Sequence, residues 1–227
     1  MSQDHRSKVA AERREKMRRR LVEAAVMVFA AKPQGDVVIE DVVARAEVSR
    51  GTFYKYFDSL DELLVTVKMA IGHEVLEHLA ARGPVSTDPA EALAYDIKSF
   101  ILTVRRYRTI GRFSASLGLG PGELIIDMVP DYMTWGVSKG RFCDTPCWLF
   151  GTVLKAGVIS VMLRIMSGEG EAEDSNEAVA LILRSLGIPP DEAQRLSATP
   201  GQELEAPPGT LIARVDEIRR SQGEVAH

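Results

Sequence analysis

Apolar residues along the chain recur every three or four positions, which is the spacing of one face of an α-helix. The first clear example runs through Leu21, Ala25, Val28 and Phe29. Longer helical patterns, separated by segments rich in Gly and Pro, cover roughly 60–81, 89–108, 109–117, 123–138, 146–167 and 174–187. No segment alternates apolar and polar residues in the way that predicts a strand. The pattern therefore predicts an all-α protein.

Two short helices are expected between the first helix and the longer ones. Residues 39–46 repeat the helical spacing, and the chain breaks at Glu47. Ser49 is a good N-cap for a third helix. Either Asp58 or Ser59 can cap a fourth, with Glu62 placed to complete a capping box from Ser59.

The third helix lies in the segment VSRGTFYKYFDSLDELL, which starts at Val48 and has four aromatic residues within five positions. On a helical wheel, one arc is aromatic and holds Phe53, Tyr56 and Phe57. A second arc is polar or glycine and holds Arg50, Gly51, Tyr54 and Lys55. We expect Phe53 and Phe57 to bury against neighbouring helices while the second arc faces outward.

Two short helices separated by a tight break form a helix-turn-helix layout, whose second helix fits the major groove of DNA. Arg50 could contact guanine with both guanidinium nitrogens, and Gly51 would let the duplex approach the backbone. Lys55 and the hydroxyls of Tyr54 and Tyr56 suit phosphate oxygens. An ordinary core hairpin of helices is the alternative, but it does not explain the polar arc.

The segment VIEDVVARAEVSRGTFYKYFDSLDELL, preceded by LVEAAVMVFA, resembles the N-terminal domain of the tetracycline-repressor (TetR) family of transcription regulators. The resemblance covers 21–64, about a fifth of the chain, and implies a homodimer whose two heads enter successive major grooves of operator DNA. A larger C-terminal helical domain would bind a small molecule that spreads the heads. By position, the residues implied to contact DNA are Ser49, Arg50, Gly51, Thr52, Tyr54, Lys55 and Tyr56.

The chain departs from the family pattern at three places. Val38 stands where a Thr usually caps the second helix, Glu47 replaces the turn glycine, and Leu60 replaces a Lys at the start of the fourth helix. These changes remove phosphate partners, and a positive φ at Glu47 would be strained. A basic segment over 13–20 could compensate by reaching phosphates or the minor groove.

Charge is unevenly distributed along the chain. Residues 1–20 hold eight Lys or Arg against three acidic residues, a local charge of +5, whereas the whole chain carries −4. A basic end on an acidic body indicates either a local polyanion site or a solvated tail.

The rest of the chain divides into a predicted ligand-binding and dimerisation domain over 61–196 and a linker or tail over 197–227, after a DNA-binding domain with a basic arm over 1–60. The segment 147–166 is apolar on nearly every side, so it is either an internal core helix or, as the resemblance implies, part of a four-helix dimer interface formed near 146–167 and 174–187. Adaptable Met and large aromatic side chains suit an apolar ligand cavity. The candidates are Phe100, Phe113, Met128, Tyr132, Met133, Trp135, Trp148 and Met162.

Several classes of protein are disfavoured. Cys143 and Cys147 are too few for a disulfide framework, and His73 and His78 lie on different helix faces, so we expect no metal site and no cofactor. No nucleophile and base pair up as in an enzyme. The charged N-terminus is no signal peptide, and we expect a cytoplasmic protein without a membrane span. The sequence therefore predicts a DNA-binding transcriptional repressor released by a small, mostly apolar molecule, with a helical small-molecule-binding protein that has weak or no DNA binding as the alternative.

Overall fold

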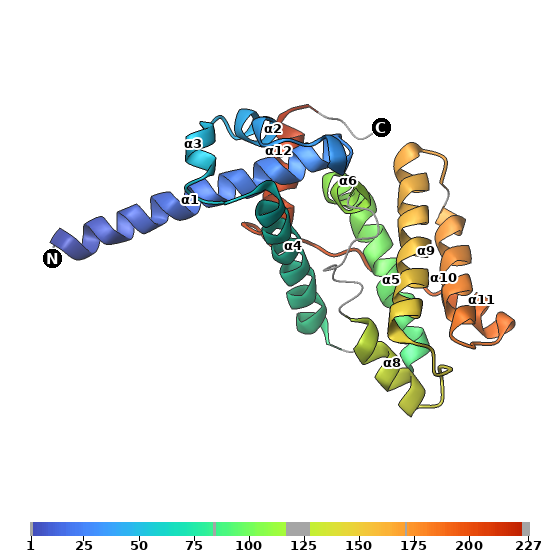
Figure 1. Cartoon of the computed structure of the whole chain (residues 1–227). Coiled ribbons are helices and arrows are strands. Elements are labelled where there is room, and N and C mark those ends of the chain that lie inside the picture. The colour runs from blue at the N-terminus through green and yellow to red at the C-terminus, as the bar shows by residue number, and fades with distance from the viewer. Residues whose placement is uncertain (1, 84, 117–127, 171, 224–227) are drawn as a thin grey trace.

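A computed structural model describes residues 2–83, 85–116, 128–170 and 172–223 of the chain (Figure 1). Within those residues the regular elements are helices and there is no strand, so the all-α prediction is confirmed. The helices are α1 (Ser2–Ala31), α2 (Ile39–Arg45), α3 (Arg50–Phe53), α4 (Leu60–Arg82), α5 (Pro89–Arg106), α6 (Arg108–Ser116), α8 (Val129–Ser138), α9 (Cys147–Ser167), α10 (Ala172–Ser185), α11 (Pro190–Ser197) and α12 (Leu211–Ser221). The helix expected over 123–138 begins outside the described residues.

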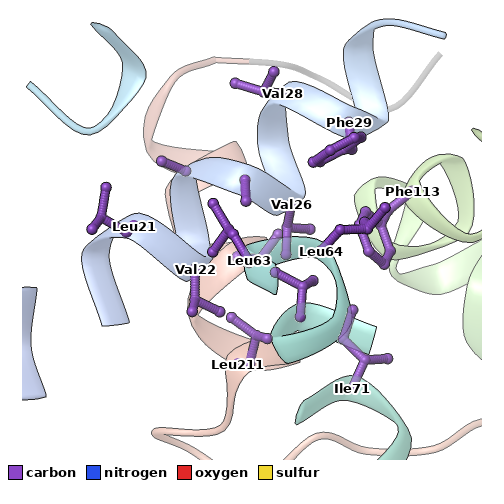
Figure 2. Packing of buried hydrophobic residues seen from close by; sticks show 14 of the residues in the cluster. Leu21, Val22, Val26, Val28, Phe29, Leu63, Leu64, Ile71, Phe113 and Leu211 are labelled. Carbon is purple, nitrogen blue, oxygen red and sulfur yellow. The ribbon is translucent and has the colours of Figure 1, made fainter. Parts of the chain in front are cut away.

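The first cluster of buried side chains joins α1–α4 to α6 and α12. Leu21 and Phe29 of α1 are fully buried, as the apolar stripe predicts, and the ring of Phe113 meets that of Phe29 edge-on at a centroid distance of 6.3 Å. Figure 2 shows Leu63 of α4 and Leu211 of α12 converging on the same side chains. Burying each such side chain stabilises the fold by about 1.5–3 kcal/mol. The N-terminal head therefore shares its core with segments from the middle and the end of the chain.

The second cluster joins α5, α8, α9, α10 and α11. Phe150 and Leu154 of α9 lie at its centre, together with Leu183 and Leu186 near the end of α10. Helix α9 is long and apolar enough to cross a membrane by length and composition alone. Because it packs along α5, α6, α8 and α10, we interpret it as a helix of the protein core, which can have the length and composition of a membrane span.

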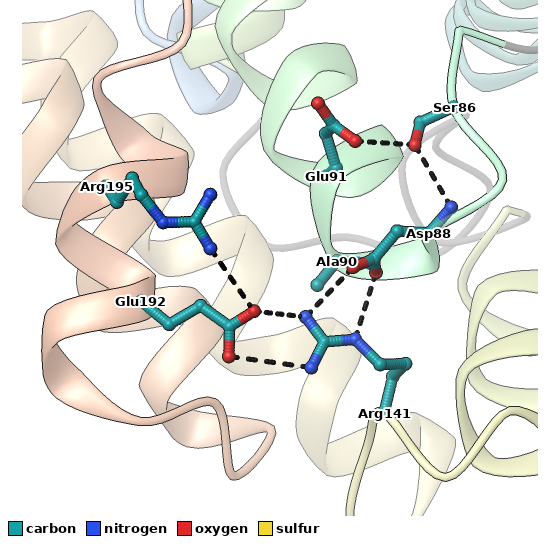
Figure 3. A network of polar contacts seen from close by, with 7 residues as sticks. All are labelled: Ser86, Asp88, Ala90, Glu91, Arg141, Glu192 and Arg195. Carbon is teal, nitrogen blue, oxygen red and sulfur yellow. Dashed lines mark hydrogen bonds and ion pairs between the residues drawn. The ribbon is translucent and has the colours of Figure 1, made fainter.

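A polar network fixes the lower end of this body (Figure 3). Arg141, after α8, reaches Asp88 at 3.0 Å and Glu192 of α11 at 2.6 Å. Asp88 also caps α5 by accepting a hydrogen bond from Ala90 N at 2.8 Å. Burial alone would raise the pKa of Asp88, but the hydrogen bonds from Arg141 and Ala90 outweigh it and hold this pKa below its ordinary value. The network ties three segments that are far apart in sequence.

Helix α1 extends well beyond the head. The apolar stripe that starts at Leu21 is preceded by a helical segment that reaches back to Ser2, and Figure 1 shows it projecting away from the other helices. The basic residues of 13–20 are carried on this projection and are mostly exposed. The basic segment is thus a continuation of α1, not a separate arm.

The segment predicted to be a linker or tail is packed in the structure as far as Gly223. Residues 201–206 run along α5, with Leu204 buried, and α12 places Leu211, Ile212 and Val215 in the first core cluster. The Pro, Gly and Glu content of this segment predicts a linker. The packing has no local signal because the partners of the segment, on α5 and in the head, lie about a hundred residues or more away in the sequence.

Candidate functional site

The turn between α2 and α3 sets the position of the second of these helices. Val48 N donates to Val43 O at 3.0 Å and Glu47 N donates to Ala44 O at 3.1 Å, which is the hydrogen-bond pattern of a Schellman motif. That motif places its C′ residue in the left-handed region, and Glu47 has φ 50°. The backbone of Glu47 therefore has the positive φ at which we expected a residue with a Cβ atom to be strained. The Glu47 carboxylate pairs with Arg20 of α1 at 2.6 Å.

Helix α2 begins without a side-chain cap. Val38, its N-cap residue, has no oxygen to accept a hydrogen bond, so the helix end relies on Asp41, whose carboxylate accepts from Val38 N at 3.1 Å. A hydrogen bond from Lys32, at 2.5 Å, together with the bond from Val38 N, lowers the pKa of Asp41. The half of a capping box that runs from the backbone of the N-cap residue to the side chain three residues later is thus present.

The next two helices start with the expected serines. Ser49 Oγ accepts from Thr52 N at 3.1 Å, and Ser59 Oγ accepts from Glu62 N at 3.1 Å. The Glu62 carboxylate, however, accepts from Asp58 N at 2.6 Å instead of from Ser59 N. The two caps fix the starts of α3 and α4.

Helix α3 and the turn after it separate their side chains as the helical wheel predicts. Phe53 and Phe57 are buried, with ring centroids 6.0 Å apart. Tyr54 and Lys55 are exposed, and Tyr56 is half-buried against the first core cluster. The two phenylalanines anchor the segment, so the phenol of Tyr54 and the ammonium of Lys55 point into solvent from a fixed backbone.

Arg50 is exposed but engaged. Its guanidinium forms an ion pair with Glu40 of α2, donates to Tyr54 Oη at 3.3 Å and lies over the Tyr54 ring at 5.7 Å from the centroid. In this arrangement the guanidinium points along the surface. A guanine contact would require Arg50 to exchange the carboxylate of Glu40 for the base edge.

Gly51 has no structural reason to be glycine. A Cβ atom built at this position would meet only Ser49 Oγ, at the ordinary contact distance of 3.9 Å, and the backbone φ is not in the left-handed region. Glycine inside a helix costs about 0.5–1 kcal/mol relative to alanine. The open space over Gly51 is therefore a surface feature that favours close approach by another molecule.

A groove separates the projecting part of α1 from the turn after α3. Its walls are basic, aromatic and apolar, and they are formed by Val9, Ala10, Arg13, Arg14, Met17, Lys55 and Tyr56. The basic part of α1 and the exposed cation after α3 thus line one surface, which suits a polyanion.

A partly open cavity of about 80 Å³ lies between α4, α5, α8 and α9. Because one water needs on the order of 10–15 Å³ by this measure, the cavity has room for several waters or a small organic ring. Its lining is Val75, His78, Arg82, Leu93, Asp96, Ile97, Ser99, Phe100, Thr103, Met128, Val129, Tyr132, Phe150, Leu154, Val158, Gln202 and Leu204.

Three polar side chains converge at one side of this cavity. Asp96 accepts from Arg82 at 2.7 Å and from the hydroxyl of Tyr132 at 2.5 Å, and the side chains of Arg82 and Asp96 are only 20% and 14% exposed. Burial and the negative charge of Asp96 raise the pKa of Tyr132 well above its usual range, so the phenol keeps its proton. An apolar ligand with a hydroxyl group would find both a donor and acceptors there.

The predicted ligand residues lie in different environments. Phe100, Met128 and Tyr132 line the cavity, and the ring of Trp135 contacts that of Tyr132 at 6.0 Å between centroids. Buried core positions away from the lining are occupied by Phe113, Met133 and Met162. Trp148 is 73% exposed on the outer face of the molecule.

Sequence reasoning did not find the polar part of the cavity. Arg82 and Asp96 belong to different helices and had no recognisable spacing, and Gln202 and Leu204 come from the segment expected to be a linker. The Asp96 carboxylate was indistinguishable from a solvated one until its partners were placed around it.

The outer face of α9 and α10 exposes large apolar side chains. Trp148, Leu149 and Leu163 on α9 and Leu181 on α10 are between 41% and 73% exposed. Figure 1 shows these two helices side by side at one edge of the molecule. Exposed apolar patches of this kind mark interaction surfaces.

Residues 21–67 match the family model described as bacterial regulatory proteins of the tetR family. The crystal structure of RolR in complex with resorcinol superposes with a TM-score of 0.58 at 23% identity, over 87% of this chain and 100% of that one. A γ-butyrolactone receptor similar to ArpA (0.54, 18%, 91% and 98%) and TylP from Streptomyces fradiae (0.55, 18%, 89% and 97%) share the fold. No curated protein matches the chain.

Proposed function

We propose that the chain, whose residues 21–67 match the tetR family of bacterial regulatory proteins, is a ligand-responsive transcriptional repressor of that family. It occupies operator DNA when free and is released by a small, mostly apolar molecule. The observation that carries this proposal is the pair of buried phenylalanines, Phe53 and Phe57, which hold Tyr54 and Lys55 in solvent beside an open Gly51.

The proposed DNA contacts follow from what each exposed group can donate. Arg50 and Gly51 face the base edges, where a guanidinium can bind guanine and the bare backbone allows close approach. Lys55, Tyr54 and Tyr56 hold phosphates, with the hydroxyls of Ser49 and Thr52 at the start of the helix. Arg13 and Arg14 add phosphate contacts through the groove that they share with Lys55.

The proposed effector is an apolar molecule, about the size of a single ring, that carries at least one hydroxyl. The cavity wall is largely apolar, and at one side it presents the polar cluster of Arg82, Asp96 and Tyr132. RolR, which has the same fold, was crystallised with resorcinol, a dihydroxybenzene. Resorcinol is therefore the first probe, with benzene as the matched control that lacks hydroxyls.

Binding of resorcinol by calorimetry tests this assignment. We expect Asp96→Asn to weaken binding at least tenfold, because a ligand hydroxyl loses a charged acceptor, and Trp148→Ala to leave it unchanged. Equal binding of resorcinol and benzene would contradict a role for the polar side.

The proposed assembly is a homodimer through α9 and α10. Trp148, Leu163 and Leu181 lie exposed on these helices and would bury against the second copy. Leu181→Glu places a charge in that face, so we expect a monomer in sedimentation velocity. The exposed Met69→Glu on α4 is the matched control and should remain dimeric.

Release follows from a change in the relative positions of the two heads. Operator binding needs both heads in successive major grooves about 34–36 Å apart. An effector that binds better to a different head spacing shifts the population toward it and lowers operator affinity. The proposed protein acts in the cytoplasm, where its DNA is.

A footprint on the DNA that flanks its own gene, followed by a salt titration on the protected fragment, tests the function. We expect a two-fold symmetric footprint and a log K that falls with log salt by about 0.9 for each phosphate contact. Lys55→Gln should reduce the slope by about one contact. A wild-type protein that binds resorcinol but protects no fragment would instead support a small-molecule-binding protein without DNA function.

A further inference from the structure

The chain between α11 and α12 follows α5 in an extended conformation, and we call residues 199–210 the strap. Three backbone N–H groups of the strap donate to two hydroxyls of α5 and to that of its C-cap residue, Tyr107: Gln202 N to Ser99 Oγ (2.9 Å), Leu204 N to Thr103 Oγ1 (2.9 Å) and Ala206 N to Tyr107 Oη (3.0 Å). The side chains of Ser99, Thr103 and Tyr107 are all buried. The strap is therefore held by a regular ladder of hydrogen bonds.

The ladder works because two periods coincide. The three hydroxyl residues, Ser99, Thr103 and the C-cap Tyr107, are spaced four apart, and four helical residues rise about 6 Å. Every second residue of the strap contributes an N–H on the same side, and two extended residues span about 6.6 Å. The match fixes one register between the strap and the helix.

Gly201 shows how closely the strap approaches α5. A Cβ atom at this position would lie 2.6 Å from Ser99 N and 2.8 Å from the carbonyl carbon of Lys98. Both are backbone atoms of a packed helix and cannot move aside. Any side chain at Gly201 must therefore lift the strap from α5.

One end of the strap forms part of the cavity described above. Gln202 and Leu204 line that cavity together with Ser99 and Thr103, the hydroxyl residues that hold them. Leu204 is buried. A molecule in the cavity therefore contacts the strap directly.

The other end leads into the head. Four residues after Ala206, Thr210 caps α12, and the carboxylate of Glu74 on α4 accepts from Leu211 N and from Ile212 N, the latter at 3.0 Å. Arg214 of α12 pairs with Glu23 of α1 at 2.5 Å.

Helix α12 also reaches the helix-turn-helix itself. Arg45, at the end of α2, donates to Gln222 Oε1 at 2.6 Å, and Val215 is fully buried in the head core. A displacement of the strap must therefore move α12 against α1, α2 and α4, or break these contacts.

We propose that the strap and α12 are a second connection between the effector cavity and the DNA-binding head, in addition to α4, and that cavity occupancy changes operator affinity through it. This inference rests on the proposed function. It assigns Gln202 and Leu204 to the effector site and gives α12 a regulatory role. Helix α4 also spans the two regions, from Leu63 in the head core to Val75 and Arg82 at the cavity.

Three variants of the full chain separate these roles. Gly201→Ala lifts the strap at the cavity. Tyr107→Phe removes only the hydroxyl that holds Ala206, on a residue that does not line the cavity. Glu205→Ala changes a strap side chain that is 86% exposed, lies 4.0 Å from the guanidinium of Arg106 and does not line the cavity, and it is the matched control.

Operator affinity with and without saturating resorcinol gives a coupling factor for each variant, and calorimetry gives resorcinol affinity. We expect Glu205→Ala to match the wild type. Tyr107→Phe should keep resorcinol affinity within about twofold and lower the coupling factor about fivefold, and Gly201→Ala should lower both. The inference is overturned if both variants keep the wild-type coupling factor while hydrogen exchange shows that the amide of Leu204 has lost its protection.

Failure of the proposed function has different signatures. If the wild type binds operator but not resorcinol, the effector class is wrong, and Gly201→Ala must still change operator affinity about fivefold for the strap to matter. If no operator is found, the strap is judged by amide exchange in α1 and α4. That exchange must be faster in Gly201→Ala than in the wild type and unchanged in Glu205→Ala; equal rates in all three proteins would refute the connection.

Discussion

Replacing Glu47 by glycine tests how the α2–α3 turn was built from this sequence. Glu47 is the C′ residue of a Schellman motif and has φ 50°, and its carboxylate pairs with Arg20 at 2.6 Å. Glu47→Gly removes the backbone strain and the ion pair together. Glu47→Gln removes only the ion pair, because the amide keeps a Cβ and carries no charge.

The magnitudes of the two effects differ. A residue with a Cβ in the left-handed region costs about 1 kcal/mol or more relative to glycine, even after the greater unfolded-state entropy of glycine is included. The pair with Arg20 is solvent-exposed, with the Glu47 side chain 81% accessible, and contributes about 0.2–1 kcal/mol. Glu47→Gly should therefore be as stable as the wild type or up to about 1 kcal/mol more stable. The free energy of unfolding of Glu47→Gly should exceed that of Glu47→Gln by about 1 kcal/mol.

Thermal unfolding measures this difference as about 2–4 °C between the two variants, given a chain of this size. Both variants release Arg20 from its carboxylate, so both should bind operator more tightly, and the salt slope should steepen by up to about 0.9 if Arg20 reaches a phosphate. Equal melting temperatures for the two variants would refute the assignment of strain to Glu47. A tighter operator complex for Glu47→Gly alone would show that the backbone, not the charge, limits DNA binding.

Other substitutions test the surface and the supporting contacts. Gly51→Ala should raise folding stability by about 0.5–1 kcal/mol and lower operator affinity at least tenfold, measured by denaturant unfolding and fluorescence anisotropy; a drop in stability would contradict the open space over this residue. Deleting 1–14 should make the salt slope of operator binding shallower by about 0.9 per lost phosphate contact, and an unchanged slope would remove the basic groove from the interface. Asp88→Asn should cost about 0.2–1 kcal/mol at neutral pH, because the amide can still cap α5 but no longer offers Arg141 a charged partner. Because the pKa of Asp88 is lowered in the folded state, that advantage should be present above its ordinary value of 3.8 and disappear as pH falls through the lower folded-state value. A difference between Asp88→Asn and the wild type that does not vary with pH would show that Arg141 does not depend on the charge.

The head was predictable from local signals. Ser49 as a cap and Phe53 and Phe57 as anchors follow from residue type and helical spacing, and each lies within a few residues of its partner. The positive φ at Glu47 was expected from the position of a turn. Sequence patterns are sufficient there because the contacts that begin and end a short helix lie within a few residues of each other.

The cavity and the strap could not be read in the same way. The role of Asp96 depends on its hydrogen bonds from Arg82 and Tyr132. The role of Thr103 depends on its hydrogen bond from Leu204 N, 101 positions further along the chain. Extended segments that pair with a helix leave no periodic apolar pattern, and a composition rich in Pro and Gly resembles a linker. The exposure of Trp148, which the proposed dimer would cover, likewise has no signal in the sequence spacing.

The sharing of one core by α1 and α12 has a consequence for biosynthesis. Leu21 and Leu211 are 190 residues apart yet belong to the same buried cluster. During translation the first helices emerge long before α12, so the core of the head stays incompletely packed until α12 has been made. A nascent chain therefore completes the core of the head only after the helices of the proposed effector domain have already been made.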